Sequence, residues 1–361
     1  MSSKINSYSK KYMKIAIDMA KVKIGLTGVN PSVGCVIVKN NKIISIGKTG
    51  INGVPHAEAD AIKNTTESLY NSDLFVSLEP CSHYGKTPPC TSNIIKKKIK
   101  RIFYGMDDVD LRSKNKSYEI LKKKNIHVKK NLLNSKCKKI YRSYIHLKNT
   151  KLPFITAKIA CSKNYVITSN KKYITNHHSL NVSHLLRYKS HAILVSHKTI
   201  NTDNPLLNCR INGLEKFSPI RIILDKNLKL KLSSNIFKTA KKYKTIIFYN
   251  KENNKIKRFK ENKIKLIKLQ LNENGMFDLK KVLNVIKKLN IHYVLLEGGK
   301  KLTLNFLKEK LVNEFFLFKT NTEINYKNNV KINNIISILN KNFKKKNIKT
   351  YLANDRLVKY Y

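Results

Sequence analysis

The chain has 361 residues, of which 41% are hydrophobic, so it is long and apolar enough for two domains that each bury a core. Its 73 lysines and arginines against 22 aspartates and glutamates give a net charge of +51. A charge this high makes nucleic acid a candidate partner. Arginines number only eight, and the lysines are spread from Lys4 to Lys359. This even distribution predicts compositional drift at tolerant surface positions and argues against a specific nucleic-acid partner.

The first part of the chain alternates between helical and strand patterns. An amphipathic helix is predicted over 7–24, and a hairpin of strands follows at Val33–Val38 and Lys42–Ile46. The next elements expected are a helix from Ala57, a strand at Leu74–Leu78, a loop over 79–90 with a helix after it, a strand at Arg101–Gly105, and a helix and strand up to Lys130. This order predicts an α/β/α sandwich around one sheet.

A second α/β pattern begins at Phe154, after a basic connecting helix predicted over 131–150. We therefore predict two domains, residues 1–148 and 149–361. The second domain is expected to contain strands at Phe154–Ala160, His191–Val195, Arg221–Leu224, Thr245–Tyr249 and Tyr293–Leu296, with helices near 176–187, 278–289 and 300–309. The stretches 251–263 and 340–349, rich in lysine and asparagine, are predicted as surface loops or solvated helix faces.

Six cysteines, at positions 35, 81, 90, 137, 161 and 209, bear on the cellular compartment. The N-terminus lacks a signal-peptide pattern, and no apolar run approaches the ~20 residues that span a bilayer. We therefore expect a cytoplasmic protein with no membrane contact and reduced thiols, in which paired cysteines are metal ligands.

Three separate motifs predict a zinc site. His56 and Glu58 stand at the start of a predicted helix, Cys81 follows a proline after a strand, and Cys90 closes the next loop. One imidazole and two thiolates give tetrahedral zinc three protein ligands and leave a fourth position for water. Glu58 would then move a proton to the substrate ring and to the departing ammonia. This is the His-x-Glu and Pro-Cys signature of zinc deaminases, so we expect one Zn²⁺ per chain and Glu58 as the catalytic residue.

The eight residues between the two cysteines lead to a family. The segments Gly25–Val38 and Glu79–Cys90, with His56 and Glu58 between them, closely resemble the deaminase half of the bifunctional riboflavin-biosynthesis deaminase/reductases. The resemblance implies a cytidine-deaminase-like fold and hydrolytic loss of the 2-amino group from 2,5-diamino-6-ribosylamino-4(3H)-pyrimidinone 5′-phosphate.

The same resemblance implies that Asn30, His83 and Lys86 line the substrate pocket. An asparagine can read a ring edge through its donor and acceptor, and a lysine in the loop suits a phosphate. One stretch departs from the family, because Asp107–Arg112 replaces its usual Asp-Pro-Asn-Pro sequence.

The second half carries further motifs in the order of the family's reductase half: Lys158–Ser162, Tyr173–Thr175, His184–Arg187, Thr199–Arg210 and Glu297–Gly299. The resemblance implies a dihydrofolate-reductase-like α/β fold and NADPH-dependent reduction of the ribosyl chain to a ribityl chain. The NADPH ligands it implies are Ala160, Tyr173, Thr199, Asp203 and Gly299. The substrate ligands it implies are Lys171, Arg187, Leu207, Arg210 and Glu297. We also expect a homo-oligomer from this resemblance.

Three alternatives remain open on the residues. The reductase half departs from its family, with Lys163–Tyr165 in place of Leu-Asp-Gly, so it could be a degenerate, inactive domain. A nucleic-acid deaminase with a basic appendage would fit the charge, but not the Cys-x8-Cys spacing or the lack of a basic-aromatic cluster. A basic binding protein with a structural zinc would need a fourth ligand, for which His83 is available, and would have no use for Glu58.

Overall fold

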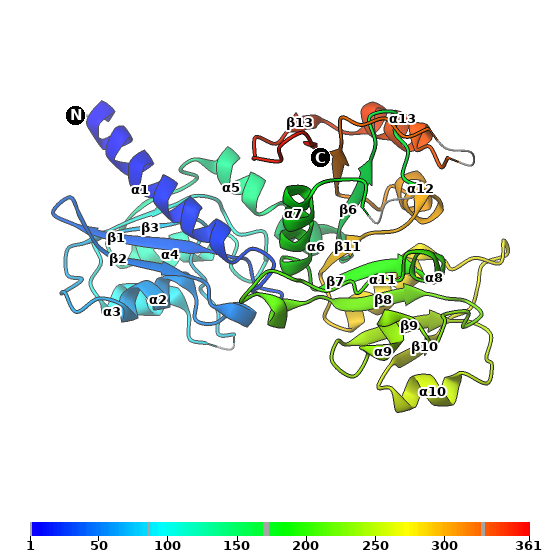
Figure 1. Ribbon diagram of the computed structural model, residues 1–361. Coiled ribbons are helices and arrows are strands. Elements are labelled where there is room, and N and C mark those ends of the chain that lie inside the picture. The colour runs from blue at the N-terminus through cyan, green and yellow to red at the C-terminus, as the bar shows by residue number, and fades with distance from the viewer. Residues whose placement is uncertain (1, 86, 169–172, 326–328) are drawn as a thin grey trace. The chain divides into compact units, whose positions relative to one another are not determined.

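The computed structural model describes residues 2–85, 87–168, 173–325 and 329–361. The chain divides into two compact units, Met1–Lys151 and Leu152–Tyr361, and each is built around one β-sheet (Figure 1). Mixed α/β architecture is therefore present in both halves, as predicted. Among the described residues, no helix has both the length and the hydropathy of a bilayer-spanning segment.

The sheet of the first unit has the strand order β2-β1-β3-β4-β5. β1 pairs antiparallel with β2 and β3, whereas β3, β4 and β5 run parallel. The strands are β1 (Gly34–Lys39), β2 (Lys42–Lys48), β3 (Asp73–Val76), β4 (Arg101–Tyr104) and β5 (His127–Lys129). Asn40 and Asn41 join β1 to β2 at φ of 47° and 63°, the left-handed conformation that a two-residue hairpin turn requires.

Helices cover both faces of this sheet. A methyl group added at Gly34 would lie 2.1 Å from the carbonyl oxygen of Ala16 in α1 (Ser2–Val22). One added at Gly47 would lie 2.1 Å from the carbonyl oxygen of Ala57 in α2 (Ala57–Lys63). Gly47 pairs with Cys35, the residue after Gly34, and successive residues of a strand face opposite sides. The two helices thus pack on opposite faces, which confirms the predicted sandwich.

The rest of the first unit consists of short helices: α3 (Cys90–Lys96), α4 (Lys116–Lys123), α5 (Asn134–Ile140) and α6 (Arg142–Thr150). The segment predicted as one connecting helix is therefore two. They meet at Tyr141, a buried residue whose hydroxyl lies 2.6 Å from Oγ of Ser77, next to β3. This buried contact ties the junction between the helices to the sheet.

The described residues of the second unit form a nine-stranded sheet of order β10-β9-β8-β7-β11-β6-β12-β14-β13. The strands from β10 to β12 in this order are parallel, and β14 and β13 are added antiparallel at one edge. The strands are β6 (Phe154–Cys161), β7 (Ala192–Ser196), β8 (Ile220–Leu224), β9 (Thr245–Tyr249), β10 (Lys265–Lys268), β11 (Tyr293–Leu296), β12 (Glu314–Lys319), β13 (Lys345–Asn347) and β14 (Arg356–Tyr360).

The helices of this unit lie between its strands in the sequence: α7 (His177–Tyr188), α8 (His197–Asp203), α9 (Asn235–Lys238), α10 (Ile256–Glu261), α11 (Leu279–Lys288), α12 (Lys300–Lys308) and α13 (Asn333–Asn342). Central strands such as β7 are buried on both faces, as is usual for parallel sheets covered by helices. The five strands and three helices predicted for this half are all present. Part of 251–263, predicted as loop or solvated helix face, forms α10, which buries Phe259.

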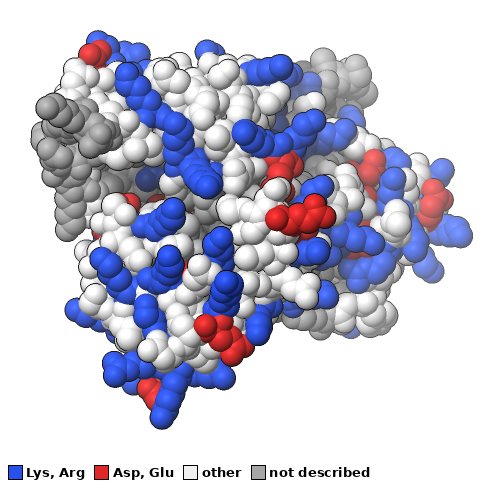
Figure 2. Space-filling model, turned by 90° about the vertical axis from the view of Figure 1, so that its right-hand side faces the viewer, with Lys and Arg blue, Asp and Glu red and all other residues white. Residues whose placement is uncertain are grey.

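Charged side chains are distributed over the face of the molecule that Figure 2 shows. On the face shown in Figure 2, Lys and Arg side chains are scattered among uncharged residues, with few Asp and Glu between them. This agrees with a lysine coat spread along the chain.

Candidate active sites

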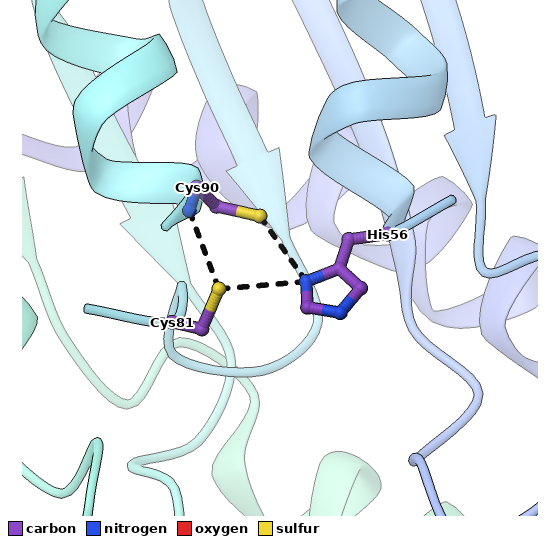
Figure 3. A group of neighbouring side chains, drawn as sticks. All are labelled: His56, Cys81 and Cys90. Carbon is purple, nitrogen blue, oxygen red and sulfur yellow. Dashed lines mark hydrogen bonds between the residues drawn. The ribbon is translucent and has the colours of Figure 1, made fainter. Parts of the chain in front are cut away.

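His56, Cys81 and Cys90 converge in the first unit (Figure 3). Nδ1 of His56 lies 3.4 Å from Sγ of Cys81 and 3.4 Å from Sγ of Cys90, and the three donor atoms lie within 4.8 Å of one another. Tetrahedral zinc with Zn–S of about 2.3 Å and Zn–N of about 2.0 Å would separate sulfur and nitrogen by about 3.5 Å. The donor set therefore fits zinc in both chemistry and spacing.

Two helix starts and a strand end bring these ligands together. His56 is the residue before α2, Cys90 is the first residue of α3, and Cys81 lies in the loop after β3. The backbone N–H of Cys90 donates to Sγ of Cys81 at 3.2 Å, which fixes the loop against the helix start. Glu58, the second residue of α2, is only 4% exposed. Burial and the nearby Cys81 raise the pKa of Glu58 to about 7.

A cavity of about 410 Å³ opens onto this cluster and is lined by His56, Glu58 and Cys81. That volume is in the range of small-molecule sites. Two of the residues expected in the substrate pocket, Asn30 and His83, also line it. Nδ2 of Asn30 donates to the carbonyl oxygen of Gly53 at 3.1 Å, and Nδ1 of His83 lies 3.0 Å from Oγ of Ser113. The third, Lys86, lies outside the described residues.

Glu79 organises one wall of the cavity, a role that motif reading missed. Its carboxylate accepts hydrogen bonds from the backbone N–H groups of Asp108 at 3.0 Å and Asn115 at 3.1 Å, and from the Ser117 hydroxyl at 2.8 Å. These bonds fasten the segment 107–117 beside the loop that carries Cys81. Asp108 in turn accepts the hydroxyl of Tyr144 in α6 at 2.8 Å, and both residues line the cavity.

In the second unit, several expected site residues gather at the carboxyl ends of neighbouring parallel strands. β6, β11 and β7 are adjacent; Ala160 lies in β6, Glu297 directly follows β11, and Thr199 lies in the helix after β7. Ligands of open parallel sheets bind at this edge. A methyl group added at Gly299, the residue before α12, would lie 3.6 Å from Oγ1 of Thr199.

The start of α12 suits a cofactor phosphate. Gly299 provides no side-chain cap, so the first backbone N–H groups of the helix remain available for an anion, and the glycine leaves space above them. This is the observation in the second unit that fits NADPH.

Arg187, expected to hold substrate, is bound to another expected ligand. Its Nε and Nη2 donate to the two carboxylate oxygens of Glu297 at 2.8 and 2.9 Å, and its Nη1 donates to the carbonyl oxygen of Asn208 at 3.1 Å. Arg210 joins the group through Oδ1 of Asn208, at 3.0 Å. Leu207, which precedes Asn208 in the sequence, is buried and has a φ of 53°.

The remaining expected residues of this half are less closely associated. Asp203 ends α8 and Tyr173 is 44% exposed, while Lys171 lies outside the described residues.

Two further side chains interact electrostatically with the group formed by Arg187, Glu297 and Arg210. Burial lowers the pKa of Lys158, in β6, against the opposing charge of Glu297. Burial and the charges of Arg187 and Arg210 lower the pKa of His184 to about 4. Both residues stand in the motifs that carried the family resemblance, and that position is the signal that could have identified them.

Comparison with known proteins covers both halves. Residues 6–106 match the model of the cytidine and deoxycytidylate deaminase zinc-binding region, and residues 153–320 match that of the RibD C-terminal domain. The riboflavin biosynthesis protein RibD of Aquifex aeolicus is 35% identical over 87% of this chain and 87% of its own length. That of Bacillus amyloliquefaciens is 33% identical over 85% of this chain and 83% of its own length.

Solved structures agree with these relatives. A diaminohydroxyphosphoribosylaminopyrimidine deaminase/5-amino-6-(5-phosphoribosylamino)uracil reductase from Thermotoga maritima superimposes with a TM-score of 0.84 at 30% identity, covering 98% of this chain and 99% of that one. Acinetobacter baumannii RibD gives a TM-score of 0.84 at 25% identity, with the same coverage. The predicted fold class is confirmed for both halves.

Proposed function

The chain belongs to the RibD family of bifunctional riboflavin-biosynthesis enzymes, and we propose how its own residues carry out the two reactions. It is a zinc-dependent deaminase and an NADPH-dependent reductase. The substrate is a phosphorylated aminopyrimidine riboside, 2,5-diamino-6-ribosylamino-4(3H)-pyrimidinone 5′-phosphate, whose ring loses the 2-amino group before the ribosyl chain is reduced to ribityl. The convergence of one imidazole and two thiols beside a buried carboxylate in a cavity of about 410 Å³ carries the proposal.

In the deaminase site, His56, Cys81 and Cys90 hold the zinc ion. Zinc, when bound, supplies a water activated for attack on the ring. Glu58 would take one proton from the attacking water and give it to the ring nitrogen. It would then take the second proton from the new hydroxyl group and give it to the amino group, which leaves as ammonia. Its burial beside the metal ligands suits a group that accepts and returns a proton shielded from bulk water. Asn30 and His83 are proposed to hold the ring in the cavity, and Lys86 is proposed as a further substrate-binding residue.

In the reductase site, Ala160, Tyr173, Thr199, Asp203 and Gly299 are proposed to hold NADPH. NADPH, when bound, supplies the hydride that reduces the sugar. Lys171, Leu207 and Arg210 are proposed to hold the phosphorylated product of the first reaction. Arg187 keeps Glu297 ionised and oriented through two parallel hydrogen bonds, so that its carboxylate can hold the sugar.

A coupled assay with Glu58→Gln tests the assignment. Purified, zinc-loaded protein is given the diaminopyrimidinone ribosyl phosphate and NADPH, and ammonia release and NADPH oxidation are followed together. The variant should release ammonia about 10²–10⁴-fold more slowly, retain its zinc, and still oxidise NADPH when given the deaminated intermediate. Glu67→Gln, at an exposed position, is the matched control. Unchanged ammonia release by the Glu58 variant would refute the role of Glu58.

The same assay separates the two halves. Ammonia release without NADPH oxidation by the parent protein would favour an inactive reductase domain. Loss of both signals with zinc still bound would overturn the proposed substrate.

The finer assignments of state and location are also proposals. A homo-oligomer is proposed from the family resemblance and a cytoplasmic location from the sequence, and light scattering of the purified chain at micromolar concentration tests the first of these. A monomeric mass with full activity would contradict it.

A further inference from the structure

One ion cluster lines the deaminase cavity without any role in the chemistry described above. It consists of Asp110, Arg112 and Lys148, which we call the Asp110 cluster. Nε of Arg112 lies 3.0 Å from Oδ1 of Asp110, and Nη2 lies 2.7 Å from Oδ2. Nζ of Lys148, in α6, lies 2.6 Å from the same Oδ2. The cluster therefore joins the loop after β4 to α6.

The charges of the Asp110 cluster leave a net positive site. Arg112, and then Lys148, hold the pKa of Asp110 well below its usual range, so the carboxylate stays ionised. One anion and two cations sum to one positive charge. Behind them, Asp108 accepts the backbone N–H of Asp110 at 3.0 Å, and burial raises the pKa of Asp108.

Exposure shows which way the cluster faces. The side chain of Asp110 is 10% exposed, that of Lys148 34% and that of Arg112 64%. The acid is thus on the inside, and the cations lie toward solvent. Within the described part of the chain, Nη1 of Arg112 makes no hydrogen bond, and Lys148 has two ammonium hydrogens beyond the one directed at Asp110. These donors are available to a ligand.

The cavity has few other cations for an anionic ligand. Among the described residues that line the cavity, Arg112 is the one arginine and Lys148 is the one lysine. A substrate whose ring lies against His56 and Glu58 carries its ribosyl phosphate away from the metal. The phosphate is the most strongly hydrated part of such a substrate, so the solvent-facing edge of the cavity suits it.

We propose that Arg112 and Lys148, oriented by Asp110, bind the 5′-phosphate of the deaminase substrate and select phosphorylated over unphosphorylated pyrimidine ribosides. The inference rests on the proposed deaminase function. It assigns a role to the stretch Asp107–Arg112, where this chain departs from its family's usual sequence. Asp110 is a positioning residue: its carboxylate holds both cations while leaving their outer donors free.

The test compares two substrates in the full-length, zinc-loaded protein. The kcat/KM for ammonia release is measured with the ribosyl phosphate and with the same riboside lacking the phosphate. Arg112→Gln and Lys148→Gln should each lower kcat/KM for the phosphorylated substrate by about tenfold, since each removes one charge-assisted contact at a partly exposed site. The value for the unphosphorylated riboside should stay unchanged. Inorganic phosphate should inhibit the parent competitively and the variants more weakly.

Matched variants separate binding from folding. Lys63→Gln, at an exposed position outside the cavity lining, should leave both substrates unaffected. Lys148→Arg keeps the positive charge and should retain most of the preference for the phosphorylated substrate. A loss of activity caused by misfolding would reduce both substrates alike.

The outcomes are distinct. If Arg112→Gln and Lys148→Gln lower kcat/KM equally for both substrates, the inference is overturned and the cluster only stabilises the loop. Unchanged kcat/KM values for both substrates would also overturn it. If the parent releases ammonia from neither substrate, the proposed deaminase function fails and takes the inference with it. If the parent deaminates both substrates with equal kcat/KM, the function stands and the phosphate site is refuted.

Discussion

Replacing Glu297 by glutamine tests the buried ion pair of the reductase site. Both partners are 11% exposed at their side chains, and Glu297 accepts both Nε and Nη2 of Arg187. Breaking a buried pair by removing one charge costs about 3–5 kcal/mol, because the other charge stays buried without a counterion. The glutamine oxygen can keep one of the two bonds, worth about 1.5–3 kcal/mol for a charged donor. We therefore expect Glu297→Gln to destabilise the protein by about 2 kcal/mol.

Urea unfolding followed by circular dichroism, with NADPH oxidation measured on the deaminated intermediate, checks this value. The variant should unfold at lower urea and lose NADPH oxidation, while ammonia release from the first site continues. Glu252→Gln is the matched control, because Glu252 bonds to Lys268 in a pair that is more than half exposed at both side chains. It should leave the midpoint unchanged. Equal midpoints for Glu297→Gln and the parent would refute the assigned strength of the Arg187–Glu297 pair.

Three further predictions concern other buried groups. Arg221 is fully buried and donates to two threonine hydroxyls and three backbone carbonyls. Arg221→Met should therefore lower the free energy of unfolding by about 2–4 kcal/mol, because it leaves these carbonyls without a donor. An unchanged urea midpoint would mean that the gain from removing a buried charge equals the cost of the unpaired carbonyls. Cys90→Ser should abolish zinc binding, measured by elemental analysis, and with it ammonia release. The variant should still oxidise NADPH when it is given the deaminated intermediate. Zinc retained at one per chain would contradict the assignment of Cys90 as a ligand. His184 has a folded pKa of about 4 against the usual 6.5, so the folded state binds fewer protons, and its contribution to stability is complete above pH 6.5 and lost as the pH falls toward 4. His184→Gln should therefore weaken the pH dependence of the urea unfolding midpoint between pH 6.5 and 4. The same pH dependence in the variant and the parent would exclude His184 as a cause of acid destabilisation.

Local patterns predicted much of the fold because they set local structure. The pair Asn40 and Asn41 predicts a hairpin, and both residues adopt positive φ there. Elements without an apolar pattern escaped prediction. α8 buries only Ile200 among its seven residues, and β13 is exposed at every position and is defined by pairing with β14. Such segments take their conformation from neighbours distant in sequence.

The zinc site could be predicted for the same reason, since its ligands stand in short motifs at two helix starts and after one strand. The walls of the cavity could not. Lys148 is one lysine among many, and only the packing of α6 brings it to Asp110, 38 residues away. Likewise, Arg187, in α7, and Glu297, directly after β11, are 110 residues apart in sequence and meet only in the folded second unit. Motif reading named both residues but gave them separate roles toward substrate.

Four of the eight arginines of this lysine-rich chain occupy positions where a lysine could not do the same work. Arg101 holds both carboxylate oxygens of Asp73, Arg112 those of Asp110, and Arg187 those of Glu297, each through two nitrogens of one guanidinium. Arg221 spans five acceptors in the interior. A lysine ammonium is a single point charge and cannot make two parallel bonds in a fixed plane. At these four positions the protein uses the planar fork of arginine, which lysine does not offer. By this reasoning Arg112 is retained for its geometry as well as its charge, so Arg112→Lys should keep the affinity for inorganic phosphate better than Arg112→Gln but loosen the loop that Asp110 anchors. Equal phosphate inhibition in the two variants would show that charge at this position contributes nothing.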